Sequence, residues 1–407
     1  MKKVIVLSSL IVIVAILFTA CGSATPQATP TNPLASATPQ ATPTNPPASA
    51  TPPATPTNPL ASATMTSGPT TPTPLPWLSP RGYHDAAYDS RCDRVIVYGG
   101  EVADYNGNLS YLHDTWTYDL ATNTWENMAP PQKLPLASSP WGFVDIGPMV
   151  YDDKVDQIIK FMGVISDTSG TGDVLSTKTW AYDCSSNTWS NLSAKGAPSG
   201  GLNGERMVYD SKADVMILFG GDILPWPSNG IEAFKNETWA YDFQTNTWTD
   251  LNPKVSPPGQ NYFPMVYDPV SDKVLAWIQP SNDGANTLWA YDYNQNTWTP
   301  HPVDKPSFRY YSGAAYVPTV KKTFFFGGAT MDTEAPFNEL WTYDSATNTW
   351  AQLTSSTGPS ARGWATLTYI PKADKLVLIG GGTDRDSFTS EVWVYDIQKR
   401  SWTQAEP

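Results

Sequence analysis

The sequence WTYDLATNTW at residues 116–125 is the first of six copies of one motif, whose internal spacing is the same in every copy. Each copy reads Trp-Xaa-Tyr-Asp, then five residues, then a second Trp. The copies begin at Trp116, Trp180, Trp239, Trp289, Trp341 and Trp393 and hold 12 of the 17 tryptophans. They lie 50 to 64 residues apart, a period typical of propeller blades or solenoid units.

Each repeat unit divides into four short strands joined by polar turns. In the first unit we expect strands at 82–88, 94–98, 115–118 and 124–127, with a long loop before residue 115. Short strands separated by turn residues favour antiparallel sheet. The Asp after the Tyr is suited to accept backbone N–H groups in the last turn, and the Asn two residues before the closing Trp suits a positive φ. The sixth copy has Arg400 at this Asn position.

One four-stranded sheet cannot bury so many indole rings. Twelve rings at roughly 200 Å² each remove about 2,400 Å² from water, of order 60 kcal/mol before entropy is counted. Six sheets stacked radially around an axis provide enough interface to bury them. The sequence therefore predicts an all-β fold of six equal sheets.

The repeat resembles that of the kelch family over about residues 81–402. The resemblance rests on a Gly pair that ends the expected second strand and on the spaced Tyr and Trp that follow. These pairs are Gly99-Gly100, Gly220-Gly221, Gly327-Gly328 and Gly380-Gly381. The second unit has Met162-Gly163 and the fourth Ile278-Gln279 instead, so those bends are expected to be built differently. The resemblance implies a six-bladed kelch β-propeller over residues 76–407. Because the expected strands start with a first strand and end with a fourth, we expect closure by complete blades rather than by a shared strand.

The first 21 residues have the features of an export signal. Lys2 and Lys3 precede an apolar run at 4–18, and small residues precede Cys21. This pattern resembles a bacterial lipoprotein signal, in which the Cys becomes the lipid-modified N-terminus, although Phe18 stands where an aliphatic residue is usual. An ordinary secretion signal and an uncleaved anchor are the alternatives. We expect lipidation of Cys21 and a membrane-anchored, extracytoplasmic protein, at the cell surface or in the periplasm.

Residues 22–75 contain no charged side chain and repeat a Ser-Ala-Thr-Pro block every 13 residues. Such a segment buries too little apolar surface to offset its ordering entropy, so we predict a disordered, Pro-rich linker. The chain has a net charge of −13, and leaving out the two N-terminal lysines gives −15 for residues 76–407. We therefore expect no nucleic-acid partner, and we expect a monomer. Cys92 and Cys184 lack metal-ligand spacing and are expected to be incidental.

The ligand site is expected on the face that carries the long loops, because such loops on a rigid scaffold commonly carry function. The loops are residues 101–114, 164–178, 222–237 and 329–339. Aligning the first strands on their Tyr places Arg81, Arg309 and Arg362 in one register. The kelch resemblance implies an Arg at the channel mouth that binds acidic or polar groups, and a guanidinium suits a carboxylate. The alternative is that each Arg pairs with a loop Asp or Glu.

Glu205, Trp226 and Trp364 complete the candidate ligand-binding set. Glu205 lies beside Arg206 in the third unit, and Trp226 lies between two prolines in a long loop. Exposed rings near a cleft stack on sugars or anchor a protein partner. The alternative for each ring is packing beneath the long loops.

The sequence contains no motif that specifies a reaction. Some kelch relatives are copper-radical sugar oxidases, but His84, His113 and His301 lie in separate segments, so we expect no metal and no cofactor. Exported kelch proteins that interconvert sialic acid anomers are a nearer analogue. That resemblance implies an acid–base residue and Arg groups at the channel mouth, a role that Glu205 with Arg81 or Arg309 could imitate, although no motif specifies it. We expect a non-catalytic binding module for a glycan or protein ligand. A sialic-acid-type sugar mutarotase or epimerase is the alternative.

Overall fold

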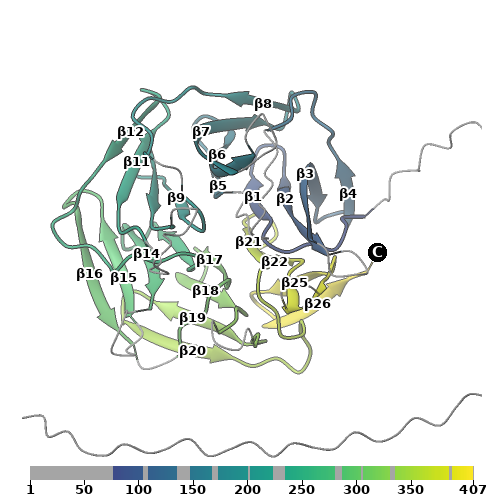
Figure 1. Cartoon of the computed structure of the whole chain (residues 1–407). Coiled ribbons are helices and arrows are strands. Elements are labelled where there is room, and N and C mark those ends of the chain that lie inside the picture. Colours follow the sequence, from purple (N-terminus) through teal and green to yellow (C-terminus); the bar gives the residue numbers. More distant parts are fainter. Residues whose placement is uncertain are drawn as a thin grey trace, which may run out of the picture. The chain divides into compact units, whose positions relative to one another are not determined.

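The computed structural model describes residues 77–103, 109–134, 147–166, 173–199, 202–222, 234–279, 287–303, 306–330, 335–384 and 387–406. Over these residues the chain forms six four-stranded antiparallel sheets arranged as a ring of blades (Figure 1). The described part of the chain contains no helix, and so none that could span a membrane. The expected signal segment (1–21) and linker (22–75) lie outside the described residues. The predicted all-β, six-bladed fold is confirmed.

The strands follow one another in chain order within each blade. Blades one to three contain β1 (Asp85–Asp89), β2 (Arg94–Ala103), β3 (Leu109–Asp119), β4 (Thr124–Asn127), β5 (Met149–Asp152), β6 (Gln157–Ser166), β7 (Asp173–Asp183), β8 (Thr188–Asn191), β9 (Arg206–Asp210), β10 (Val215–Phe219), β11 (Thr238–Asp242) and β12 (Thr247–Asp250). Blades four to six contain β13 (Met265–Asp268), β14 (Lys273–Ile278), β15 (Thr287–Asp292), β16 (Thr297–Pro302), β17 (Gly313–Val317), β18 (Lys322–Phe326), β19 (Leu340–Asp344), β20 (Thr349–Leu353), β21 (Thr366–Ile370), β22 (Lys375–Ile379), β25 (Val392–Asp396) and β26 (Ser401–Ala405). A short hairpin, β23 (Gly382–Asp384) with β24 (Ser387–Phe388), lies between β22 and β25.

The ring closes without a shared strand, as predicted. The first blade uses β1 to β4 and the last uses β21, β22, β25 and β26, so each sheet is complete. Contacts between the last and first blades join the ends of the ring. The side-chain amide of Asn123 donates to the carbonyl oxygen of Glu406 at 2.6 Å, and the N–H of Gly381 donates to the carbonyl oxygen of Arg81 at 3.0 Å.

Strands β2 and β6 run further than the sequence predicts. The prediction that Gly99-Gly100 ends the second strand is wrong, because β2 continues to Ala103 with a register shift between Tyr98 and Gly100. The two glycines have φ of 62° and 105°, and they bend the strand without ending it. The β6–β7 hairpin has a similar register shift, between Met162 and Val164. Much of the two expected loops at 101–114 and 164–178 is therefore extended hairpin.

The turn between the third and fourth strands is built as predicted. In blade one Asp119 accepts the N–H groups of Ala121 and Thr122 at 2.8 and 3.3 Å. Asn123 has a φ of 53°, and the Tyr118 hydroxyl donates to its side-chain oxygen at 2.9 Å. Arg400 adopts the same left-handed conformation in blade six, with a φ of 55°.

The turn between the first and second strands has the same construction, which the sequence reading did not predict. Asp89 accepts the N–H groups of Arg91 and Cys92, and the Tyr88 hydroxyl donates to Asp93, whose φ is 58°. The equivalent pairs are Tyr151–Asp156 (2.8 Å), Tyr209–Asp214 (2.7 Å), Tyr267–Asp272 (2.7 Å) and Tyr369–Asp374 (3.0 Å). These turns form the face opposite the long loops, which we call the short-turn face.

Ion pairs on the short-turn face join neighbouring blades. We call the Tyr near the end of each first strand, Tyr88 in blade one, the turn Tyr. In each pair, the residue three positions after the turn Tyr of one blade contacts the residue five positions after the turn Tyr of the next blade. The pairs are Arg91–Asp156 (2.5 Å), Lys154–Asp214 (3.3 Å), Lys212–Asp272 (3.8 Å) and Lys372–Asp93 (3.1 Å). Between blades four and five these positions hold Val270 and Lys321, so no such pair is formed there.

The tryptophans hold neighbouring blades together, but not all twelve are buried. Trp116, Trp125, Trp180, Trp189, Trp248, Trp298 and Trp402 are buried, whereas Trp239, Trp289, Trp341, Trp350 and Trp393 are half-buried. The prediction is thus wrong for five rings. Three of these five donate their indole N–H to partly exposed carboxylates, as Trp239 does to Glu237 at 3.0 Å, so they lie at the edge of the core. Second tryptophans such as Trp189 bond the preceding blade instead, here Thr115 at 3.0 Å.

Cys92 and Cys184 form a disulfide, so the prediction that they are incidental is wrong. Cys92 lies in the turn after β1 and Cys184 in the turn after β7, with Cα atoms 6.5 Å apart. That distance is ordinary for a disulfide. Because 92 residues separate the two in sequence, only the stacking of blade two on blade one brings them together.

Candidate functional site

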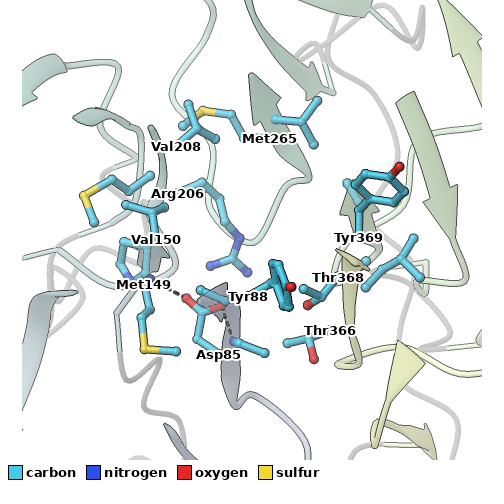
Figure 2. Close-up of a pocket in the computed structure, with 18 of the residues that line it drawn as sticks. Asp85, Tyr88, Met149, Val150, Arg206, Val208, Met265, Thr366, Thr368 and Tyr369 are labelled. Atoms are coloured by element: carbon cyan, nitrogen blue, oxygen red, sulfur yellow. Dashed lines mark hydrogen bonds between the residues drawn. The ribbon is translucent and has the colours of Figure 1, made fainter. Parts of the chain in front are cut away.

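A cavity of about 590 Å³ lies at the centre of the ring. Its wall is formed by the first strands of all six blades, β1, β5, β9, β13, β17 and β21. Figure 2 shows the side chains of several of these strands arranged around it. The volume is in the range of small-molecule sites. We take this cavity as the candidate functional site.

Four aromatic side chains, here called the aromatic plug, close the end of the cavity towards the long loops; three of them line the cavity and the fourth, Tyr262, packs against two of these. They are Tyr83, Tyr262, Tyr311 and Trp364, each five residues before the turn Tyr of its blade. The ring centre of Tyr311 lies 4.8 Å from that of Tyr262, 5.1 Å from Trp364 and 5.4 Å from Tyr83. Tyr83 also contacts Tyr262 at 6.1 Å. Tyr83 and Tyr262 belong to blades one and four, which are opposite in a six-membered ring, so this contact crosses the axis.

The backbone of the plug residues explains why they meet. All four have a left-handed φ, of 50° to 60°, which is unusual for bulky side chains. This conformation turns each N–H toward the equivalent carbonyl oxygen of the preceding blade, with distances of 3.3 Å for Tyr83 to Trp364, 3.1 Å for Trp364 to Tyr311 and 2.9 Å for Tyr311 to Tyr262. Tyr262 in turn donates to Gly204 at 2.7 Å. Glycine fits this backbone without strain, whereas a side chain costs about 1–2 kcal/mol, so the rings must contribute through packing or binding.

The residues three positions before each turn Tyr form one layer of the cavity wall, here called the polar layer. Asp85, Arg206 and Thr366 occupy this register in blades one, three and six, and prolines or glycine occupy it elsewhere. Arg206 is the only Lys or Arg among the described residues that line the cavity, and its side chain extends into it (Figure 2). Its Nη1 donates to the carbonyl oxygen of Glu205 at 2.9 Å. The Asp85 carboxylate accepts the N–H groups of Met149 and Ala86 at 2.5 and 2.8 Å.

His84 also lines the cavity and is held neutral. Burial and the nearby charge of Arg81 lower its pKa from 6.5 to about 3. Its Nε2 lies 3.1 Å from the hydroxyl oxygen of Thr366. The imidazole is therefore an uncharged part of the wall at neutral pH.

Six tyrosines, one from each blade, form a collar at the short-turn end of the cavity. The collar consists of the turn Tyr of each blade, namely Tyr88, Tyr151, Tyr209, Tyr267, Tyr316 and Tyr369. Burial raises the pKa of every one of these phenols, that of Tyr151 to about 12. They are therefore neutral at physiological pH, and most have their hydroxyl fixed by the turn Asp described above.

The three arginines predicted from their register do not line the cavity. Each is buried and pairs with an acidic residue of its own blade, Arg81 with Asp114 at 2.7 Å, Arg362 with Glu391 at 2.5 Å, and Arg309 with Glu339. The same acids accept the indole N–H groups of Trp116, Trp393 and Trp341. The geometry thus favours the alternative of a structural ion pair, and ligand binding by these arginines stays a prediction.

Hydrogen bonds and charge set the ionisation of these acids. Burial opposes the charge of Asp114, but its hydrogen bonds and ion pair with Arg81 hold its pKa below the ordinary value of 3.8. The same balance with Arg309 lowers the pKa of Glu339, and the indole of Trp393 together with Arg362 lowers that of Glu391. All three acids are therefore ionised at neutral pH.

Of the other sequence candidates, Trp364 alone lines the cavity, as part of the aromatic plug. Glu205 is buried immediately before β9 and does not line the cavity. Trp226 lies outside the described residues. Among the described residues a single group, Asp89, Cys92 and Cys184, has the spacing of a metal site, but its two thiols are used in the disulfide.

The comparison with protein families agrees with this architecture. The family model of the KLHDC2/KLHL20/DRC7 Kelch-repeats domain matches residues 61–266 and 274–407, which is most of the chain. The chain therefore belongs to the kelch-repeat family of β-propellers.

Two curated relatives and one solved structure are similar to this chain. It is 29% identical over 99 residues to multiple epidermal growth factor-like domains protein 8 of Rattus norvegicus, a match that covers 24% of this chain and 4% of the relative. It is 26% identical over 186 residues to N-acetylneuraminate epimerase 1 of Escherichia coli O6:H1, covering 41% of this chain and 47% of the relative. The structure of YjhT is similar with a TM-score of 0.56 and 16% identity, over 81% of this chain and 98% of that chain, and shows the shared fold.

Proposed function

We propose that this kelch propeller is a binding module whose central cavity takes a small glycan ligand that carries a carboxylate. The observation that carries the proposal is Arg206, whose side chain extends into the cavity from the first residue of β9 (Figure 2). A guanidinium binds a carboxylate through two parallel hydrogen bonds, which gives both affinity and orientation. A protein ligand on the long-loop face is the other partner expected from the sequence.

The remainder of the wall suits a sugar. Hydroxyl groups of Thr366 and Thr368 supply polar contacts, and Met149, Val208 and Met265 supply apolar ones (Figure 2). Tyrosine and tryptophan rings present flat apolar faces of the kind on which sugar rings stack. A mostly apolar wall with a few convergent polar groups is the usual composition of a ligand pocket.

We place the protein outside the cytoplasm, anchored to the membrane through a lipid on Cys21. The N-terminal sequence supports this proposal, and so does the Cys92–Cys184 bond, because structural disulfides persist mainly in oxidising compartments. Metabolic labelling with an alkyne fatty acid tests the anchor. The native chain should carry the label and sediment with membranes, and Cys21→Ser should lose both properties. Retention of both by Cys21→Ser would refute lipidation at this residue.

Titration calorimetry with N-acetylneuraminate, glucuronate and glucose tests the binding proposal. Arg206→Met keeps the length and apolar stem of the side chain but removes the guanidinium. It should weaken binding of the two acids by about ten- to a hundred-fold, the value of a charged hydrogen-bonded pair, and leave the neutral sugar unaffected. Arg94→Met, a change in a partly exposed ion pair outside the cavity, is the matched control. Equal affinities of native protein and Arg206→Met for both acids would refute the proposed role.

The similarity to N-acetylneuraminate epimerase 1 favours a second candidate, a sugar mutarotase or epimerase. Exchange of anomers requires a proton to move between the anomeric hydroxyl and the ring oxygen. Asp85 is the better candidate for that transfer than Glu205, because Asp85 lines the cavity and Glu205 does not. His84, with its pKa near 3, is a weak base.

Anomeric exchange in N-acetylneuraminate, followed by NMR with catalytic amounts of protein, separates the two candidates. An enzyme should accelerate exchange, and Asp85→Asn should abolish the acceleration while retaining an acceptor for the Met149 N–H. Absence of any acceleration by the native protein would dismiss the enzyme and leave the binding module.

A further inference from the structure

We infer that the cavity is single-ended, that its ligand enters through the short-turn face, and that it therefore accepts a free or chain-terminal sugar acid rather than an internal unit of a polymer. The ligand chemistry rests on the proposed function. The route rests on the geometry of the cavity alone.

Among the described residues, the aromatic plug closes the axis on the long-loop side, and the equivalent position of blade two, residue 146, lies outside them. Tyr83, Tyr262 and Trp364 are 8%, 5% and 4% exposed, and rings from opposite blades are in contact. The layer behind them is also filled, because the ring of Phe388 lies 6.3 Å from that of Tyr83 and a Cβ on Gly82 would meet Phe388 at 2.2 Å. A sugar ring cannot pass such a layer without displacing several side chains together.

The plug is fixed by its backbone and not only by side-chain contacts. Four hydrogen bonds link Gly204, Tyr262, Tyr311, Trp364 and Tyr83 in turn around the axis. A Cβ on Gly204 would lie 3.1 Å from the ring of Tyr262, so the neighbouring backbone is shaped to that ring. Moving the plug would break contacts in several blades at once. The plug therefore forms a fixed closed end of the cavity, here called its floor, and not a movable gate.

The opposite end of the same cavity reaches solvent. Its lining includes the residue two positions after each collar Tyr in five blades, namely Ser90, Asp153, Ser211, Pro269 and Pro371. Ser90, Asp153 and Pro371 are exposed turn residues. The rim of the cavity is therefore on the short-turn face, where turns are brief and leave the collar uncovered.

The order of the layers sets the orientation of the ligand. Along the chain of each blade, the plug position comes five residues before the collar Tyr and the polar-layer position, which Arg206 occupies in blade three, comes three residues before it. The rim position comes two residues after the collar Tyr. At about 3.3 Å per residue, Arg206 begins roughly 16 Å below the rim. A carboxylate that reaches Arg206 must enter first, with the rest of the sugar toward the collar. A polymer cannot thread through a cavity that has a floor, so only a free sugar acid or a chain end can place its carboxylate there.

Thiol labelling tests the route without needing a ligand. The reporter is Thr368→Cys, which lies in the cavity wall, in the full chain with Cys21→Ser so that no other free thiol remains beside the disulfide. The probe is methyl methanethiosulfonate. Ser211→Trp, at the short-turn rim, should slow labelling by about tenfold or more, because close-packed side chains exclude the reagent. Thr383→Trp, an exposed residue of β23 beside the plug side of blade six, is the matched control and should change the rate less than about twofold.

A rescue experiment tests the plug itself. Adding Tyr311→Ala to Ser211→Trp should restore labelling, because it opens a hole in the floor. Ser90→Trp provides a second rim variant should Ser211→Trp fail to fold, as judged by circular dichroism. Slowing by Thr383→Trp with none by either rim variant would overturn the route.

Ligand protection separates this inference from the proposed function. If N-acetylneuraminate and 3′-sialyllactose both slow labelling, while internally linked sialic acid in a long polymer with blocked ends does not, the class of ligand is supported. Protection by the blocked polymer would overturn it. If no sugar protects the thiol but the rim variants still slow labelling, the route stands and the proposed function fails.

Discussion

Protonation of His84 should make the folded protein lose stability well above the pH at which carboxylates titrate. The side chain is 5% exposed and its pKa is lowered from 6.5 to about 3, chiefly by burial and by Arg81. The unfolded chain therefore binds a proton near pH 6.5 that the folded chain does not accept until about pH 3. Stability is complete above pH 6.5 and falls as the pH decreases through this window.

The magnitude follows from the width of the window. Each unit of pH between the two pKa values changes the free energy of unfolding by about 1.4 kcal/mol, so at pH 5 the loss from this residue is about 2 kcal/mol. The pKa values of His113 and His301 are also lowered by burial, and they add smaller losses of the same sign. Burial raises the pKa of Asp89 and Asp152, which act in the opposite direction. All these other groups are also present in a variant that lacks only His84. Their contributions to the free energy of unfolding therefore cancel when the native protein and that variant are compared.

Urea unfolding at pH 7.5 and pH 5, followed by tryptophan fluorescence, measures the effect. His84→Gln keeps a polar atom near the hydroxyl of Thr366 but cannot be protonated in this range. It should be less stable than the native protein at pH 7.5 and should lose about 2 kcal/mol less than the native protein on moving to pH 5. His301→Gln, at a half-buried position on the outer strand β16, should keep most of the native pH dependence. If His84→Gln and the native protein lose the same stability, the assignment of the neutral buried imidazole is wrong.

Three further changes test the framework. Replacing both Cys92 and Cys184 with Ser should lower the free energy of unfolding by about 2–4 kcal/mol, because the bond closes a loop of 92 residues in the unfolded chain, and a urea midpoint equal to that of the native protein would contradict this. Arg362→Met should cost about 2 kcal/mol in the same assay, since it leaves Glu391 partly buried beside Trp393 without its cation, whereas Lys399→Met, in an exposed pair, should change stability by under about 0.5 kcal/mol. Val270→Glu should provide the missing ion pair with Lys321 and raise stability by up to about 0.5 kcal/mol, a gain that 1 M salt should remove. A gain that persists in salt would point to packing instead.

The repeated features of the fold were predictable because their causes are local. Asp119 and Asn123 act within a turn of a few residues, so the spacing of the motif contains all the geometry that the turn needs. The continuation of β2 past Gly99-Gly100 was not predictable in the same way, because it depends on pairing with a strand that starts at Leu109. The Cys92–Cys184 bond depends on the contact between two blades, which no local pattern contains.

The candidate site was harder to predict, because it occupies positions where the six blades differ. The collar Tyr recurs in every blade and marks a structural position, whereas the register three residues before it holds Asp85, Arg206 or Thr366 according to the blade. A side chain at such a position cannot be explained by the common blade geometry. Comparing the six first strands at this register would have pointed to Arg206 without the structure.

Comparing the six blades position by position also explains why Arg81, Arg309 and Arg362 form ion pairs within their blades and do not line the cavity. A residue that recurs at one register faces the same local surroundings each time, so recurrence favours a structural role over convergence on a ligand. The sequence contains a second sign of this role. Blades with Arg81, Arg309 and Arg362 all have an acid two residues before the opening Trp, whereas blade four, with Gln260 at the Arg register, has Thr287 at the acid position. Arg and acid are thus present together or absent together in these four blades, whereas blade three has Glu237 at the acid position with Leu202 at the Arg register, and there Lys235 pairs with the acid instead. Each of these acids has a cation partner within its own blade, as expected of groups that neutralise each other. In a repeat protein, then, a charged residue that recurs with its partner belongs to the scaffold, and one that breaks the repeat, as Arg206 does, is the better candidate for a ligand.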